Sequence, residues 1–113
     1  EIRYLLDLAH DFKKKKQEQI ILNPEDKRFC FHFYGKVQGV GFRFVCSQYA
    51  LQYHLTGWVC NEKDGSVILQ IQGCVDKIQQ LIQQLHKDTY IRIESYDFKE
   101  IPVVKESGFV AKY

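Results

Sequence analysis

Long apolar runs and a strong excess of either charge are both missing from this chain of 113 residues. The formal net charge is only +2, so the composition demands no polyanionic partner, and we expect no nucleic acid. No apolar stretch approaches the roughly 20 residues that span a bilayer, and the N-terminus lacks the basic-then-apolar order of a signal peptide. We therefore expect a cytoplasmic globular protein of one compact domain without a membrane partner.

Paired metal-ligand spacing is also missing. The four cysteines are widely separated, with no Cys-x-x-Cys pair and no nearby histidine at ligand spacing. We therefore predict no metal site and no cofactor. Two disulfides stay arithmetically open, but reduced and mostly half-buried thiols are favoured for a cytoplasmic chain. Methionine is absent too, which leaves open whether residues precede Glu1.

The apolar pattern changes between period two and period 3.6 along the chain. Phe29, Phe31 and Phe33 alternate with more polar residues, as in a strand with one buried face. Apolar residues at helical spacing occur in two later segments. Runs of β-prone residues lie between these two segments and after the second one. In chain order we predict a strand from residue 28, a helix at 42–54, strands at 56–61 and 66–72 joined by an Asp-Gly turn, a helix at 75–87, a strand at 90–99 and a short edge strand at 109–113.

The order βαββαβ predicts the α+β fold class. A ferredoxin-like split βαβ sandwich satisfies it, with one antiparallel sheet and two helices on a single face. Ahead of it, residues 1–12 place apolar side chains at helical spacing, so we predict an extra N-terminal helix. The chain then divides into a helical extension and linker at 1–28 and a domain at 29–113. We expect a monomer, with self-association through the N-terminal helix as an alternative.

A glycine-rich loop separates the first predicted strand from the first predicted helix. Glycines allow sharp turns that bring backbone N–H groups close to a ligand, and a helix that follows adds the positive end of its dipole. The P-loop lysine, the third glycine of a dinucleotide fingerprint and a nucleophilic cysteine are all missing from it. We predict a phosphate-binding loop without a nucleophile, formed by Gln38, Gly39, Val40, Gly41, Phe42 and Arg43.

Asn61 ends the second predicted strand and is the second candidate for a functional residue. If the topology brings it opposite Arg43, its neutral amide can hold a water in line with a bound phosphate without the repulsion that a carboxylate would exert. All four histidines lie outside both segments, so no strong general base is evident. Such a site suits a phosphate whose leaving group departs unprotonated, such as a carboxylic-phosphoric mixed anhydride.

Residues 35–43 and 57–67 closely resemble the two signature segments of the acylphosphatase family, and residues 109–113 resemble its closing strand. The resemblance runs from about Phe29 to Tyr113. It implies a ferredoxin-like fold and metal-free hydrolysis of small acyl phosphates to carboxylate and phosphate. The phosphate-binding role of the family then falls on Arg43 and the water-orienting role on Asn61. Cys60 replaces a residue that is commonly basic or polar in the family, and we expect it to point away from Asn61.

Other functions stay open at this point. RNA-recognition domains share the βαββαβ order, but their aromatic motif belongs on the third strand, where residues 67–71 hold no aromatic side chain. A non-catalytic phosphate-binding module is a further alternative, as is an acylphosphatase-like domain of a maturation enzyme that handles carbamoyl phosphate. Intact Arg43 and Asn61 argue against an inactive member of the family.

Overall fold

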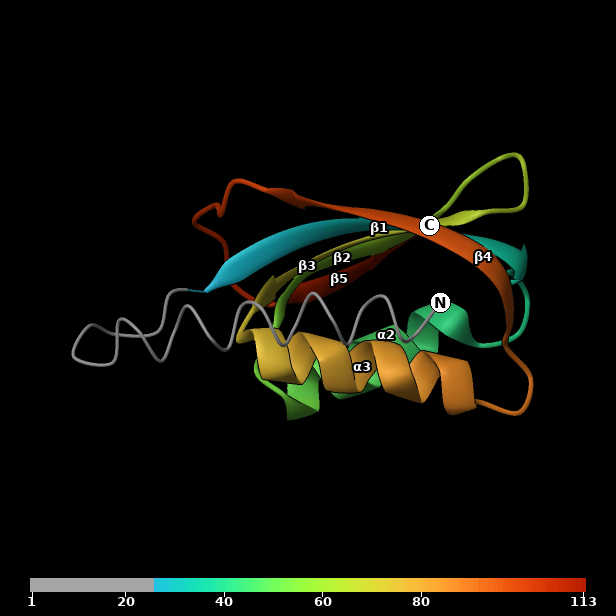
Figure 1. Cartoon of the computed structure of the whole chain (residues 1–113), viewed down its shortest axis with the longest axis horizontal. Coiled ribbons are helices and arrows are strands. Elements are labelled where there is room, and N and C mark those ends of the chain that lie inside the picture. The colour runs from blue at the N-terminus through green and yellow to red at the C-terminus, as the bar shows by residue number, and fades with distance from the viewer. Residues whose placement is uncertain (1–25) are drawn as a thin grey trace.

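A computed structural model describes residues 26–113 of the chain. The predicted helix at residues 1–12 and most of the predicted linker lie outside the described residues. The elements, labelled in Figure 1, are β1 (Lys27–Lys36), α2 (Phe42–Gln52), β2 (Thr56–Asn61), β3 (Val67–Gly73), α3 (Val75–Lys87), β4 (Arg92–Ile101) and β5 (Phe109–Lys112).

The predicted elements within residues 26–113 are present, with boundaries that shift by one or two residues. The first helix was predicted to reach His54 but ends at Gln52, and His54 has a left-handed backbone with φ 58°. The fourth strand begins at Arg92 rather than at residue 90. The Asp88 carboxylate accepts hydrogen bonds from the backbone N–H groups of Tyr90 and Ile91, at 2.9 and 3.2 Å. This side-chain turn delays the start of the strand.

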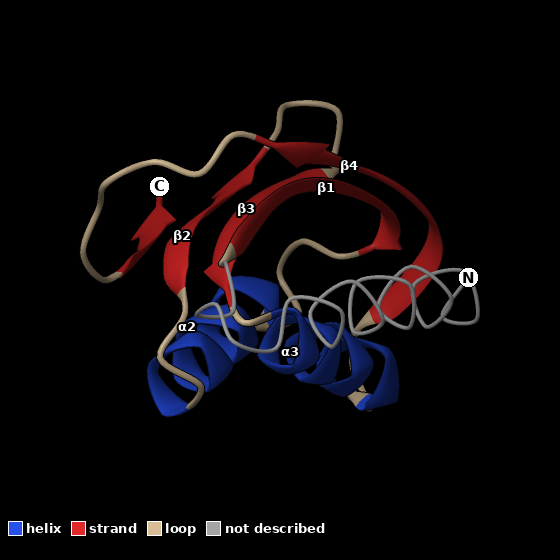
Figure 2. Ribbon diagram, turned by 60° about the vertical axis from the view of Figure 1, so that its left-hand side comes forward, coloured by secondary structure: helices blue, strands red, loops and turns tan. Residues whose placement is uncertain are grey.

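The five strands form one sheet in the order β4-β1-β3-β2-β5. The pairs β1–β4, β1–β3 and β2–β3 are antiparallel, as predicted, but β5 pairs parallel with β2. The prediction of an antiparallel sheet is therefore wrong for the last strand. After β4 the chain crosses the end of the sheet to the opposite edge (Figure 2). It starts β5 at the end where β2 also starts, so the two strands run in the same direction.

The core lies between the sheet and the two helices, which cover a single face (Figure 1). Phe29, Phe31 and Phe33 point into it from β1 and are at most 2% exposed. Burying such a side chain contributes about 1.5–3 kcal/mol. The helices supply buried residues at helical spacing, Phe42, Cys46 and Ala50 from α2, and Val75, Ile78, Leu81, Ile82 and Leu85 from α3. Phe33 and Phe42 contact each other, with ring centroids 5.1 Å apart, which fixes the first turn of α2 against β1.

A buried polar cluster holds the crossing segment on the other face of the sheet. Arg28 is only 3% exposed and donates to Oε1 of Gln70, at 3.0 and 3.2 Å, and of Gln72, at 3.2 Å. It also forms an ion pair with Glu106. The Gln72 side chain exchanges hydrogen bonds of 2.8 and 2.9 Å with the backbone of Val104. These contacts anchor residues 102–108 and thereby set where β5 begins.

Candidate active site

The glycine loop lies between β1 and α2, and its backbone opens toward a pocket. Gly39 and Gly41 have φ values of 70° and 86°, a left-handed conformation that other residues adopt only with strain. A Cβ atom added to either glycine meets no atom within 4 Å, so the space beside them is open. Gly41 precedes the first turn of α2, which has no side-chain cap. The first N–H groups of that helix are therefore suited to receive an anion.

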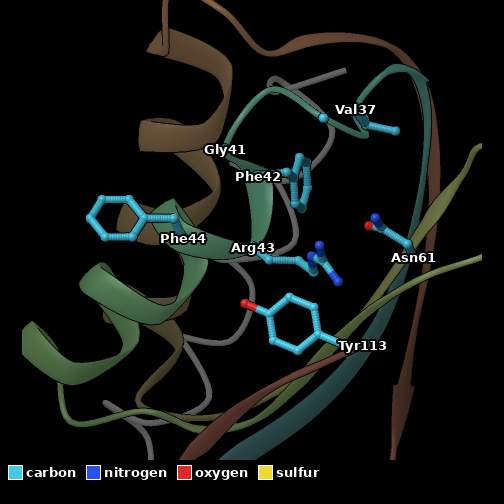
Figure 3. Close-up of a pocket in the computed structure, with 8 residues that line it drawn as sticks. Val37, Gly41, Phe42, Arg43, Phe44, Asn61 and Tyr113 are labelled. Carbon is cyan, nitrogen blue, oxygen red and sulfur yellow. The ribbon is translucent and has the colours of Figure 1, made fainter.

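The pocket has a volume of about 160 Å³, several times the roughly 30 Å³ that a water molecule occupies in the liquid. It is lined by Val37, Gly39, Gly41, Phe42, Arg43, Phe44, Asn61 and Tyr113 (Figure 3). The two predicted site residues, Arg43 from α2 and Asn61 from β2, thus meet in one small pocket beside the glycine loop. Their proximity follows from the sheet order and was predicted from the topology.

Arg43 is the second residue of α2 and is held in place by the end of the chain. Its Nη1 donates a hydrogen bond of 3.0 Å to the backbone oxygen of Lys112. Its guanidinium carbon lies 4.1 Å from the centroid of the Tyr113 ring, a cation–π contact, and Figure 3 shows the two side chains together beside Asn61. Lys112 is held in turn, because its Nζ lies 4.1 Å from the centroid of the Trp58 ring.

Asn61 contributes an amide whose oxygen is free to bind a ligand. Its Oδ1 is buried and has no hydrogen-bond partner among the described residues. A buried acceptor without a partner costs roughly 1–3 kcal/mol, so a donor that enters the pocket and reaches this oxygen is favoured. Cys60 does not line the pocket. Its thiol donates instead to the backbone oxygen of Asn61, at 3.4 Å.

The predicted loop residues do not all line the pocket. Gly39, Gly41, Phe42 and Arg43 do, whereas Gln38 and Val40 do not. The Val40 side chain packs against the core. The Gln38 amide instead donates to two backbone oxygens of the β2–β3 turn.

Three further residues line the pocket that the sequence did not single out, namely Val37, Phe44 and Tyr113. Val37 is fully buried and anchors the start of the loop. Figure 3 shows the Phe44 ring turned away from Arg43 and Asn61, and this side chain is 71% exposed. The contact of Tyr113 with Arg43 depends on the pairing of β5 beside β2, which are distant in sequence, so no local pattern signals it.

The turn after Asn61 is braced from the open face of the sheet. Asp64 Oδ1 accepts hydrogen bonds from the Ser66 backbone N–H, at 2.9 Å, and from the Ser66 hydroxyl, at 2.5 Å. These bonds lower the pKa of Asp64. His32 Nε2 lies 2.6 Å from the same hydroxyl, and His32 Nδ1 lies 3.1 Å from the Tyr34 hydroxyl. This row of polar groups links the turn to β1.

The pocket is lined by one cationic side chain, that of Arg43. None of its lining residues is a histidine, a carboxylate or a cysteine. Within residues 26–113, no group of three or more His, Cys, Asp or Glu side chains is arranged to hold a metal ion. The four cysteines are thiols, with Cys46 buried and the others half-buried, as predicted. No helix in the same range is both long and apolar enough to cross a membrane.

Comparison with known proteins agrees with this geometry. The family model for Acylphosphatase matches residues 29–111. The acylphosphatase of Salinibacter ruber is 41% identical over 73 residues, which cover 64% of this chain and 77% of that protein. The structure of an acylphosphatase from Coxiella burnetii has a TM-score of 0.71 at 32% identity and is matched over 77% of this chain and 93% of that chain.

A larger protein contains a similar domain. The structure of T. kodakarensis HypF has a TM-score of 0.67 at 31% identity, and the match covers 77% of this chain but only 12% of that one. The likeness therefore concerns one part of HypF. The family model, by contrast, covers nearly all the described residues, and the chain belongs to the acylphosphatase family.

Proposed function

We propose that this chain hydrolyses acyl phosphates, the mixed anhydrides of carboxylic and phosphoric acids, to carboxylate and inorganic phosphate. The observation that carries the proposal is the composition of the pocket. A glycine loop, a guanidinium and an amide oxygen that has no hydrogen-bond partner within residues 26–113 share one space of about 160 Å³. Family membership supports the same reaction.

The phosphate would lie against the open backbone of Gly39 and Gly41, at the N-terminus of α2. The N–H groups there and the two-pronged guanidinium of Arg43 match the oxygens of a phosphate dianion. Hydrogen bonds to a charged group contribute about 1.5–3 kcal/mol each, so a few of them account for binding. The contacts of Arg43 with Lys112 and Tyr113 restrict the arginine before the ligand arrives.

Asn61 would orient the attacking water. Its Oδ1 accepts a hydrogen bond from the water, which places the water oxygen in line with the bond to the acyl group. The water oxygen bonds to phosphorus, the bond from phosphorus to the bridging oxygen breaks, and the carboxylate leaves with the electron pair. The phosphate product retains the protons of the water. Because a carboxylate is a good leaving group, the step needs no acid, which agrees with a pocket lining that contains no carboxyl or histidine side chain.

A second candidate is an acylphosphatase-like domain of a larger maturation enzyme that handles carbamoyl phosphate, and the match to 12% of the HypF chain shows that a similar domain occurs within a longer protein. Carbamoyl phosphate is also a mixed anhydride, so the same pocket chemistry applies to it. Relative turnover on benzoyl and carbamoyl phosphates separates the two candidates. RNA binding is less favoured, because the open face of β3 carries Ile68, Gln70 and Gln72 in place of aromatic rings.

The test is steady-state hydrolysis of benzoyl phosphate in the presence of a chelator, with the wild-type chain beside Asn61→Ala. We expect wild-type turnover, and a loss of about 10²-fold or more in kcat for the variant, as is common when a positioned group is removed. Inorganic phosphate should inhibit the wild type and should bind Asn61→Ala with similar affinity. No turnover by the wild type would refute the proposal and favour a phosphate-binding module.

A further inference from the structure

Gln38 lies in the glycine loop, but its side chain reaches across to the β2–β3 turn. Its Nε2 donates to the backbone oxygen of Glu62, at 2.6 Å, and to the backbone oxygen of Ser66, at 2.9 Å. The side chain is half-buried. One amide group therefore uses both of its N–H bonds on two carbonyls of the same turn.

Those two carbonyls belong to a closed turn. The Glu62 N–H donates to the Ser66 oxygen at 2.8 Å, and the Gly65 N–H donates to the Glu62 oxygen at 3.1 Å. Glu62 directly follows Asn61 at the end of β2. A group that fixes the Glu62 carbonyl therefore also fixes the backbone that carries the Asn61 amide.

The two halves of the pocket come from different elements. The loop and Arg43 belong to the β1–α2 connection, while Asn61 belongs to β2, and β1 and β2 are not neighbours because β3 lies between them. No ladder of backbone hydrogen bonds therefore joins the loop directly to Asn61. The bridge made by Gln38 supplies a direct connection at that point.

We propose that Gln38 is a positioning residue that sets the separation between the water held by Asn61 and the phosphate cradle, formed by the backbone of Gly39 and Gly41 and the guanidinium of Arg43. The proposal rests on the proposed hydrolysis and assigns Gln38 no contact with the substrate. The role needs an uncharged side chain that donates two hydrogen bonds. A methionine of similar length cannot donate, and a glutamate of the same shape would direct an acceptor at two other acceptors.

The experiment compares the wild-type chain with Gln38→Met, Gln38→Glu and a matched control, Gln48→Met. Gln48 is an exposed glutamine on α2 outside the pocket. Each variant is checked for a folded state by thermal unfolding, and Gln38→Glu replaces Gln38→Met if the latter is not folded. The readouts are kcat and KM for benzoyl phosphate and the inhibition constant of inorganic phosphate.

We expect kcat to fall about 10- to 100-fold in Gln38→Met, because a displacement of about 1 Å between reacting groups can cost 10²-fold. KM and the phosphate inhibition constant should stay within about threefold of wild type, because the cradle is untouched. Gln48→Met should match the wild type in all three. In the background of Asn61→Ala, Gln38→Met should add no further loss, since it acts through that amide.

Three results would overturn the inference. A wild-type kcat in Gln38→Met would show that the bridge does not matter for catalysis. A loss of phosphate affinity as large as the loss in kcat would place the role of Gln38 in the cradle. A further loss of kcat in the double variant would mean that Gln38 does not act through Asn61. In each case wild-type turnover, lost in Asn61→Ala, leaves the proposed reaction standing, whereas an inactive wild type refutes that reaction itself.

Discussion

The guanidinium of Arg43 stacks on the ring of Tyr113, with 4.1 Å between Cζ and the ring centroid. The contact joins the first turn of α2 to the residue that follows β5. The same guanidinium donates to the backbone oxygen of Lys112. Arg43, the residue proposed to bind phosphate, is therefore oriented by a segment that is distant in sequence.

Replacement of Tyr113 by leucine should weaken phosphate binding. A cation–π contact at an exposed site contributes about 0.5–1 kcal/mol, which corresponds to a rise of roughly two- to fivefold in the phosphate inhibition constant. Tyr113→Phe keeps the ring and should bind phosphate like the wild type. Equal inhibition constants for wild type and Tyr113→Leu would show that the ring does not help to hold Arg43.

Replacement of Arg43 by alanine should abolish both phosphate binding and turnover while the domain stays folded, because the side chain is partly exposed and lies outside the core. Arg43→Lys keeps the charge but loses the two-pronged geometry, so its binding should be intermediate. Thermal unfolding with and without inorganic phosphate measures the effect. Phosphate protection of unchanged size in Arg43→Ala would mean that the anion binds elsewhere.

Gly41→Ala tests whether Gly41 contributes to phosphate binding beyond the stability that backbone strain would cost. The left-handed φ of 86° at Gly41 makes alanine unfavourable by about 1–2 kcal/mol. Gly108 is a matched control, because its φ of 77° is similar and an added Cβ there also meets no atom within 4 Å. Both variants should lose similar stability in denaturant titrations, but only Gly41→Ala should lose phosphate affinity. A similar loss of affinity in Gly108→Ala would attribute the effect to stability alone.

Asp64 gives a prediction on pH. Hydrogen bonds from the Ser66 side chain and backbone, and a smaller effect of His32, lower the pKa of Asp64 in the folded chain from the ordinary value of 3.8. A lowered pKa stabilises the folded state above the pKa of the unfolded chain, and this stabilisation is lost as pH falls through the folded pKa.

Asp64→Asn should therefore have a lower Tm than the wild type at pH 7, and the gap should close below about pH 4. Asp26→Asn changes an exposed aspartate next to β1 and serves as the control for the loss of one negative charge. Thermal unfolding between pH 2 and pH 7 measures both variants. A gap that stays constant over this range would show that ionisation of Asp64 does not contribute.

Burial raises the pKa of the Cys46 thiol, because a thiolate is costly in the core. In the folded protein, iodoacetamide at pH 8 should therefore modify the half-buried Cys30, Cys60 and Cys74 before Cys46. In denaturant all four should react. Peptide mass spectrometry gives the order, and early labelling of Cys46 in the native state would indicate local opening of α2.

The sequence predicted those features that depend on residues close together in the chain. The alternation of Phe29, Phe31 and Phe33 marks a strand, and the glycines before Arg43 mark a turn into a helix. Asn61 could be placed opposite Arg43 because the βαββαβ order implies a specific arrangement of strands. These predictions required only the local spacing of apolar residues and the strand arrangement that the βαββαβ order implies.

Long-range contacts could not be predicted in the same way. Arg28 follows a charged segment and reads as a surface residue, yet it is buried by Gln70, Gln72 and Glu106, which only the folded sheet brings together. The direction of β5 was wrongly predicted because alternation shows that a segment is a strand, not which way it runs. That direction depends on the crossing at residues 102–108.

The parallel pairing of β5 with β2 also makes the pocket depend on the whole sheet. Arg43 and Lys112 are 69 residues apart in sequence, and β5 reaches Arg43 only along the sheet edge that β2 provides. Contacts of such long sequence separation raise the contact order of a domain, which goes with slower folding. A chain in which β5 is undocked would leave Arg43 without both of its C-terminal contacts. Full affinity for phosphate would thus report the docking of β5.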